Sequence, residues 1–438
     1  EYGIFSYVLS LAGFFTIFAD LGVNSLMTRE IAGHPEKRSI YFVNALRVKA
    51  ILISITAALI VFAAPKFSNI EEAVALLPFV ALLVFFDNLR DFIFAYFRGI
   101  EKMEREAFLV VLMNTAIAVA GFIVLNFYKT AGALLFSYIA SVVILSIVAL
   151  YLIKDLIKGI FKNFDKEIFK QFIRDSWPLA FTSLFGIFMI NIDVVMLGWW
   201  RTAEEIGYYS ASQRIVQILY TLPAILASAI FPAISRFIKN KDVEKTRLLN
   251  EKTMSALYFA AIPMVIGGII LSKSIIKFVF GAEYLPGSAS FQILIATILI
   301  QFPSAILGAL IMAYNQQKQL FKYAGAGSIS NVVLNALFIP IFGIAGSAMA
   351  TVIAQIVYFA PVWLKIKQIG NFYTLRHLKK IIIAGIIMGI FGYVFDRFWE
   401  LNVIVNIIAS AGIYLGALYL MKEKIIGEIK ELFGKIKG

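Results

Sequence analysis

The chain has 438 residues and a formal net charge of +13; 61% of its residues are hydrophobic and 15% are charged. Soluble domains are close to half apolar and a quarter charged, so this composition excludes an ordinary soluble protein. The chain has no cysteine and two histidines, which excludes a disulfide framework and argues against a thiol or histidine metal site or catalytic relay, so we predict no metal and no cofactor.

Thirteen apolar segments follow one another in chain order. Each is long enough, as a helix, to span the ~30 Å hydrocarbon core of a bilayer. They cover residues 4–27, 41–64, 73–98, 106–126, 131–153, 176–200, 205–232, 253–271, 289–314, 319–340, 343–364, 378–397 and 402–421. We therefore predict an all-α polytopic, multi-pass membrane protein.

The basic residues predict the orientation of these segments. Of the 40 Lys and Arg residues, thirty lie in the C-terminal tail, in the loops after the odd-numbered segments, or at the segment ends that border those loops. Six lie in the opposite loops or at their borders, and four lie deeper inside segments. This bias predicts a cytoplasmic C-terminus in the cell membrane. It also explains the net positive charge without a nucleic-acid partner.

An internal repeat predicts the domain organisation. The first residues, Glu-Tyr-Gly-Ile-Phe-Ser, return 204 positions later as Glu-Ile-Gly-Tyr-Tyr-Ser, and 129–143 resembles 343–357. The second copy follows an apolar segment and the first copy does not, so we expect that the first of fourteen helices is missing. The predicted parts are an N-terminal lobe at 1–153, a basic cytoplasmic linker at 154–175, a C-terminal lobe at 176–367, and a transmembrane hairpin with a basic tail at 368–438.

Short motifs in the repeat resemble a known family. Asp193-Val-Val-Met-Leu-Gly198, Glu205-Ile-Gly-Tyr-Tyr-Ser-Ala211 and Phe231-Pro232 look like the polysaccharide-transporter (O-antigen flippase) branch of the multidrug/oligosaccharidyl-lipid/polysaccharide exporter superfamily. Asp20-Leu-Gly22 followed by Arg29-Glu30 resembles the first half of that family. The resemblance implies two six-helix lobes related by a pseudo-two-fold axis along the membrane normal, a trailing helix pair, and flipping of polyisoprenyl-diphosphate-linked oligosaccharides.

Charged residues inside apolar segments are candidate site residues, because a charge near the bilayer centre usually faces a cavity or a partner. Asp87, Arg90 and Asp91 share one helix face, with Asp87 ~16 Å from the cytoplasmic end of its segment. They either line a substrate cavity or form a structural ion pair. Arg47 and Lys49 lie within the second segment, near its predicted cytoplasmic end. Their side chains either contact the diphosphate or extend to the membrane interface.

Two further sets of polar residues lie in the predicted spans. Asp193 and Arg214 have matching depths on consecutive segments, and they predict an ion pair that latches, switches or only supports the structure. Asp20 joins them as a candidate gating or ion-coupling residue. Asn331 and Asn335, at i and i+4, either bind sugar hydroxyls or bond between helices.

The leading functional hypothesis is a lipid-linked oligosaccharide flippase that works by alternating access. A multidrug cation antiporter of the same superfamily and a non-transporting membrane scaffold are the alternatives. We predict that the chain is not an enzyme, because it shows no paired carboxylates, phosphate-binding Gly-rich loop or nucleophile–base pair. The expected partners are the lipid-linked oligosaccharide and membrane lipids, with polysaccharide polymerase machinery as a further candidate. Coupling to Na⁺ or H⁺ stays open.

Overall fold

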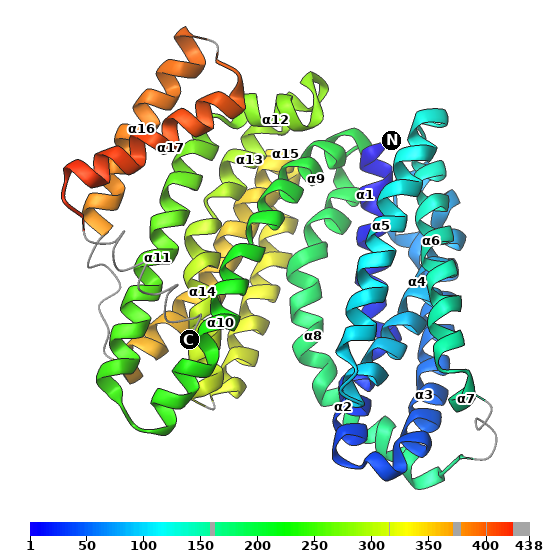
Figure 1. Cartoon of the computed structure of the whole chain (residues 1–438). Coiled ribbons are helices and arrows are strands. Elements are labelled where there is room, and N and C mark those ends of the chain that lie inside the picture. Colours follow the sequence, from blue (N-terminus) through cyan, green and yellow to red (C-terminus); the bar gives the residue numbers. More distant parts are fainter. Residues whose placement is uncertain (158–162, 315, 371–377, 400, 424–438) are drawn as a thin grey trace. The chain divides into compact units, whose positions relative to one another are not determined.

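The computed structural model describes residues 1–157, 163–314, 316–370, 378–399 and 401–423. These residues form helices and connecting turns without a strand (Figure 1), which confirms the predicted all-α class. Among the described residues, ten helices are long and apolar enough to cross a membrane, or eleven if one bent pair is a single span. The chain is therefore a multi-pass membrane protein, whereas the count of thirteen spans stays a prediction.

The chain divides into two compact units, Glu1–Gly207 and Tyr208–Gly438. The first unit holds α1 (Tyr2–Asp20), α2 (Val23–Gly33), α3 (Arg38–Ala58), α4 (Glu71–Gly99), α5 (Met103–Phe127), α6 (Ala131–Leu152), α7 (Lys154–Ile157), α8 (Lys166–Trp200) and the start of α9 (Ala203–Leu219). Short turns, η1 (Pro35–Lys37), η2 (Leu59–Ala63) and η3 (Ala64–Phe67), flank α3.

The second unit holds the rest of α9, then α10 (Thr221–Lys239), α11 (Val243–Ile270), α12 (Ser272–Phe280), η4 (Ala282–Gly287), α13 (Ser288–Ile295), α14 (Ile298–Ala313), α15 (Gln317–Gly370), α16 (Leu378–Phe398) and α17 (Val403–Leu420). The hairpin of α16 and α17 packs along α11 (Figure 1). Gly385 and Gly389 allow this approach, since a Cβ at either position would come within 2.8 Å of Ile266.

Breaks in the helices fall inside several predicted segments. The first predicted segment, 4–27, is interrupted at Leu21 and Gly22, which have φ angles of 40° and 80°. Gly343 has a φ of 61° and divides the long helix α15 where the sequence predicts a loop. Gly22 and Gly343 adopt a positive φ without a steric penalty because they have no Cβ, whereas Leu21 takes the left-handed conformation with one. The predicted order of apolar blocks is preserved, but the helices are more broken than the hydrophobic pattern suggests.

Helix α8 packs within the first unit, against α1, α2 and α3. At the C-terminal end of α8, Trp199 donates from its indole nitrogen to the carbonyl of Phe67 at 2.7 Å, and its own carbonyl accepts from Asn69 at 2.9 Å. The sequence predicts that residues 176–200 belong to the C-terminal lobe. The predicted lobe boundaries stay a prediction, and the structure adds that α8 completes the packing around α1.

The two copies of the repeated motif meet at a helix crossing. A Cβ on Gly3 would lie 1.6 Å from the carbonyl oxygen of Ala203 and 2.8 Å from the backbone nitrogen of Gly207. Glycine at position 3 therefore permits a backbone contact that no other residue allows at this spacing. Gly207 is the equivalent of Gly3 in the second copy, so the repeat brings its own glycines together.

Candidate functional site

The charged residues of the first unit form two clusters on either side of α4. Lys49 of α3 reaches α1 and α4. Its ammonium donates to Asp20 Oδ1 at 2.9 Å and to Asn88 Oδ1 at 3.3 Å. The Asn88 amide nitrogen in turn donates to the carbonyl of Val84 at 2.9 Å, which fixes the orientation of the amide. Three helices thus hold one ammonium group.

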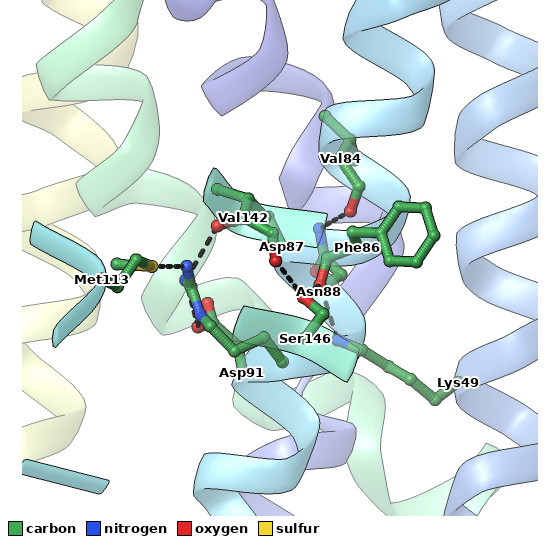
Figure 2. Close-up of polar contacts among 10 residues, drawn as sticks. Lys49, Val84, Phe86, Asp87, Asn88, Asp91, Met113, Val142 and Ser146 are labelled. Atoms are coloured by element: carbon green, nitrogen blue, oxygen red, sulfur yellow. Dashed lines mark hydrogen bonds and ion pairs between the residues drawn. The ribbon is translucent and has the colours of Figure 1, made fainter. Parts of the chain in front are cut away.

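The second cluster is centred on Arg90. Its guanidinium lies 2.8 Å from Asp87 Oδ1 and 2.7 Å from Asp91 Oδ1. The guanidinium also contacts the sulfur of Met113 on α5 and lies 5.4 Å from the centre of the Phe94 ring. Figure 2 shows Met113 to one side of α4 and Lys49 to the other. The structure brings the predicted triad together, as its i, i+3, i+4 spacing requires.

The cations of both clusters are hidden and the acids are not. The Lys49 side chain is 0% exposed and that of Arg90 is 8% exposed. The side chains of Asp20, Asp87 and Asp91 are 28%, 30% and 43% exposed. An exposed carboxylate inside a membrane span is expensive against lipid, so these oxygens face water or a ligand. The surface of this site therefore offers hydrogen-bond acceptors rather than free cations.

Arg47 lies at a different part of α3. Its guanidinium is 4.3 Å from the centre of the Phe164 ring, in the segment that leads into α8. One turn away, the buried Asn44 binds the same segment twice: its amide nitrogen donates to the carbonyl of Asn163 at 3.1 Å, and its oxygen accepts from the backbone of Asp165 at 3.2 Å. Arg47 thus belongs to a docking point for this segment. Its predicted contact with a diphosphate stays a prediction.

Asn331 and Asn335 are fully buried in the second unit. Asn335 donates to Asn331 Oδ1 at 2.8 Å and accepts from the Ser347 hydroxyl at 2.8 Å, across the break at Gly343. The second of these hydrogen bonds joins the two parts of α15 on either side of Gly343. The amide nitrogen of Asn331 has no hydrogen-bond partner. Contact with sugar hydroxyls stays a prediction, because no side-chain surface of these residues is exposed.

The predicted latch residues fall in different units. Asp193 on α8 is fully buried in the first unit, and Arg214 is exposed in the second. Their ion pair stays a prediction.

Two contacts, those of Asn88 and Met113, were not predicted from the sequence. Asn88 follows Asp87 directly and lies about 100° further round α4, outside the face that Asp87, Arg90 and Asp91 share, so the pattern of shared faces passed over it. Its signal was an amide in the middle of an apolar span, which usually bonds to another helix. Met113 carries no polar signal.

The second unit contains an apolar cavity of about 530 Å³ between α9, α11, α13 and the hairpin. Its walls include residues from each element: Leu219, Gly267, Ile295, Met388, Ala411 and Tyr414. A cavity of this composition fits a hydrocarbon chain and not a charged group. Among the residues that the structure describes, no group of three or more His, Asp or Glu could hold a metal ion.

The chain matches the family model described as polysaccharide biosynthesis protein over residues 1–238, which is more than half of its length. The chain belongs to the polysaccharide biosynthesis protein family. A second model, MatE, matches residues 178–337. The predicted family is therefore confirmed.

One relative is the probable low-salt glycan biosynthesis flippase Agl15 of Haloferax volcanii, which is 24% identical over 81% of this chain and 74% of its own length. Two solved structures share the fold. The lipid II flippase MurJ in an inward closed conformation matches with a TM-score of 0.77 at 20% identity, over 97% of each chain. An inward-facing multidrug resistance MATE family transporter of the MOP superfamily matches with a TM-score of 0.65 at 15% identity, over 84% of this chain and 94% of its own. The predicted exporter-type fold is confirmed.

Proposed function

We propose that this chain is a flippase that moves a polyisoprenyl-diphosphate-linked oligosaccharide across the cytoplasmic membrane by alternating access. The observation that carries the proposal is the pair of charged clusters inside an apolar helix bundle of a polysaccharide biosynthesis protein. The name of the Haloferax relative supports it. A polar headgroup needs such a lining to cross the hydrocarbon core, since an unlined passage has no hydrogen-bond partners.

Each part of the substrate has a matching surface. The exposed oxygens of Asp87 and Asp91 suit sugar hydroxyls, which donate hydrogen bonds to carboxylates. The diphosphate suits Lys49 and Arg90 once their pairs with the acids open, because cations are the natural partners of phosphate oxygens. The apolar cavity of the second unit suits part of the isoprenoid tail.

A second candidate, a multidrug cation antiporter, is favoured by one observation. The partly exposed charges of the site are Asp20, Asp87 and Asp91. A carboxylate attracts an organic cation as well as it accepts a hydrogen bond from a hydroxyl group. The MatE match over residues 178–337 agrees with this alternative. A scaffold without transport activity would leave the buried charge pairs without a role beyond packing.

Several predicted properties belong to this proposal. We place the chain in the cell membrane with a cytoplasmic C-terminus, without catalytic activity of its own, and beside polymerase machinery that uses the flipped glycan. The acids Asp20, Asp87 and Asp91 are candidate carriers of a coupling Na⁺ or H⁺.

The test is transport in proteoliposomes with a fluorescent polyisoprenyl-diphosphate oligosaccharide, whose headgroup is detected on the far side by a membrane-impermeant lectin. We expect a protein-dependent flux, with at least a tenfold loss in the Lys49→Met/Arg90→Met double variant. Arg105→Ala is the control, because Arg105 lies in the first turn of α5 and its side chain is exposed. Parallel uptake of an organic cation with no lipid flux would select the antiporter. Wild-type lipid flux in the double variant would refute the binding role of the two cations.

A further inference from the structure

Two helices of the second unit are broken at positions that face each other. The α9–α10 span is interrupted at Tyr220, where the backbone nitrogen bonds back three residues to Gln217 instead of four. Pro223 explains the position of the break. It has no N–H for the carbonyl of Leu219, and its ring would clash with that carbonyl inside a continuous helix, whereas the first turn of a helix accommodates proline. The helix therefore ends at Leu219 and a new one begins at Thr221.

The second break separates α13 from α14. The two helices meet at an angle of 41°. The backbone nitrogens of Ala296, Thr297, Leu299 and Ile300 all bond to the residue three positions earlier. Such a 3₁₀ stretch within an apolar span often marks a hinge.

A chain of partly buried hydrogen bonds joins the two breaks. The Thr297 hydroxyl donates to the carbonyl of Leu294 at 2.5 Å, so its oxygen is left to accept from the Tyr220 hydroxyl, also at 2.5 Å. The amide nitrogen of Gln355 on α15 donates to the Tyr220 oxygen at 3.5 Å. Thr297 is 0% exposed and Gln355 5% exposed, so neither group has water as an alternative partner. The bonds have one consistent direction, from Gln355 through Tyr220 to Thr297.

The same breaks border the apolar cavity. Leu219, the last residue of α9, and Ile295, the last residue of α13, both line it. A change in either bend moves one of these side chains, and with it a wall of the cavity.

We infer that Tyr220 and Thr297 tie the two breaks into one hinge, so that α9–α10 and α13–α14 bend together and reshape the apolar cavity as they do. Each helix could otherwise bend independently, because each has its own defect in the backbone ladder. A change of conformation at one helix is then transmitted to the other through a hydroxyl pair rather than through general packing. The use of this hinge in transport rests on the proposed function, whereas the hinge itself does not.

Hydrogen exchange followed by mass spectrometry tests the coupling. The full chain is reconstituted in lipid nanodiscs without substrate, so the result does not depend on whether it transports lipid. The peptides of interest cover residues 217–223 and 294–300. Removal of one neutral hydrogen bond is worth about 1 kcal/mol, so we expect roughly fivefold faster exchange.

Tyr220→Phe and Thr297→Val should each accelerate exchange at both breaks, including the one on the other helix. Their double variant should exchange no faster than the faster single variant, and Thr297→Ser should restore the wild-type rate because it keeps the hydroxyl. Tyr323→Phe is the matched control, since that hydroxyl bonds to Gln319 within one helix. Faster exchange confined to the substituted helix, or a double variant whose acceleration equals the product of the two singles, would overturn the inference.

Discussion

The ion pair between Asp20 and Lys49 predicts an unequal response to the loss of either partner. Removal of one member of a buried pair costs about 3–5 kcal/mol, because the other charge stays buried without compensation. Asp20→Ala leaves the ammonium of Lys49, which is 0% exposed, with Asn88 at 3.3 Å. Since the Asp20 side chain is 28% exposed, water can enter the space it vacates, and we expect the lower limit, about 3 kcal/mol.

The reverse substitution is cheaper. Lys49→Met fills a similar volume without a charge, and it leaves a carboxylate that water already reaches. Asp20 Oδ1 also keeps its bond from the backbone nitrogen of Asn24 at 3.2 Å. We expect a loss of about 1 kcal/mol, typical of one net hydrogen bond. Asp20→Ala should therefore cost about 2 kcal/mol more than Lys49→Met.

The assay is reversible unfolding of the purified chain in mixed detergent micelles, with the two single variants and the double variant as a thermodynamic cycle. The double variant should be more stable than Asp20→Ala alone, since it removes the unpaired cation. Lys170→Met is the control: its pair with Glu167 is exposed, so the change should stay within about 0.5 kcal/mol of wild type. A Lys49→Met variant that is less stable than Asp20→Ala would refute the reasoning from exposure.

Three further changes test packing contacts within each of the two units. Gly389→Leu should detach the hairpin from α11 and lower the thermal midpoint, whereas Gly412→Leu, which meets open space, should not; equal midpoints would contradict the glycine contact. Asn44→Ala should release the segment before α8, with faster proteolysis there and a loss of about 1–3 kcal/mol for two backbone groups, while Asn126→Ala, whose amide is exposed, should leave the cleavage rate unchanged. Asp165→Ala removes the N-cap of α8 and should cost about 1 kcal/mol of unfolding free energy, but a neutral result would show that Asn44 alone holds the helix start.

The helical class and the order of spans followed directly from the sequence, because each apolar block must satisfy its backbone within itself in lipid. The breaks within these segments could not be predicted in this way, because hydropathy is averaged over about 20 residues whereas a single residue decides where a helix breaks. Tyr220 lies within the predicted segment 205–232, which shows no loss of apolar character at that point, whereas the break at Gly343 lies at a predicted boundary between two segments. Pro223 indicates a break in this segment. The break is placed at residues 219–221 because the first turn of a helix accommodates proline, so the new helix begins shortly before it.

The candidate site was predictable where spacing along one helix decides it. Asp87, Arg90 and Asp91 meet because i, i+3 and i+4 share a face. The partners of Lys49 were less accessible, since Asp20 and Asn88 lie on two other helices. The exposure of each charge could not be predicted from the sequence. It depends on how α1, α3 and α4 pack, and it leaves the acids rather than the cations partly exposed.

Under the proposed function, the exposure of the acids would link binding of the substrate to binding of a coupling cation or proton. If a diphosphate takes Lys49, Asp20 loses its partner in a region of low dielectric constant, and a lone carboxylate there is costly. A cation or proton at Asp20 removes that cost, so its binding and the binding of the anion must favour each other to the same extent. The same argument applies to Arg90 with Asp87 and Asp91. In the empty site, the pair of Lys49 with Asp20 also avoids the cost of a lone buried cation in the membrane, which an unpaired lysine would carry.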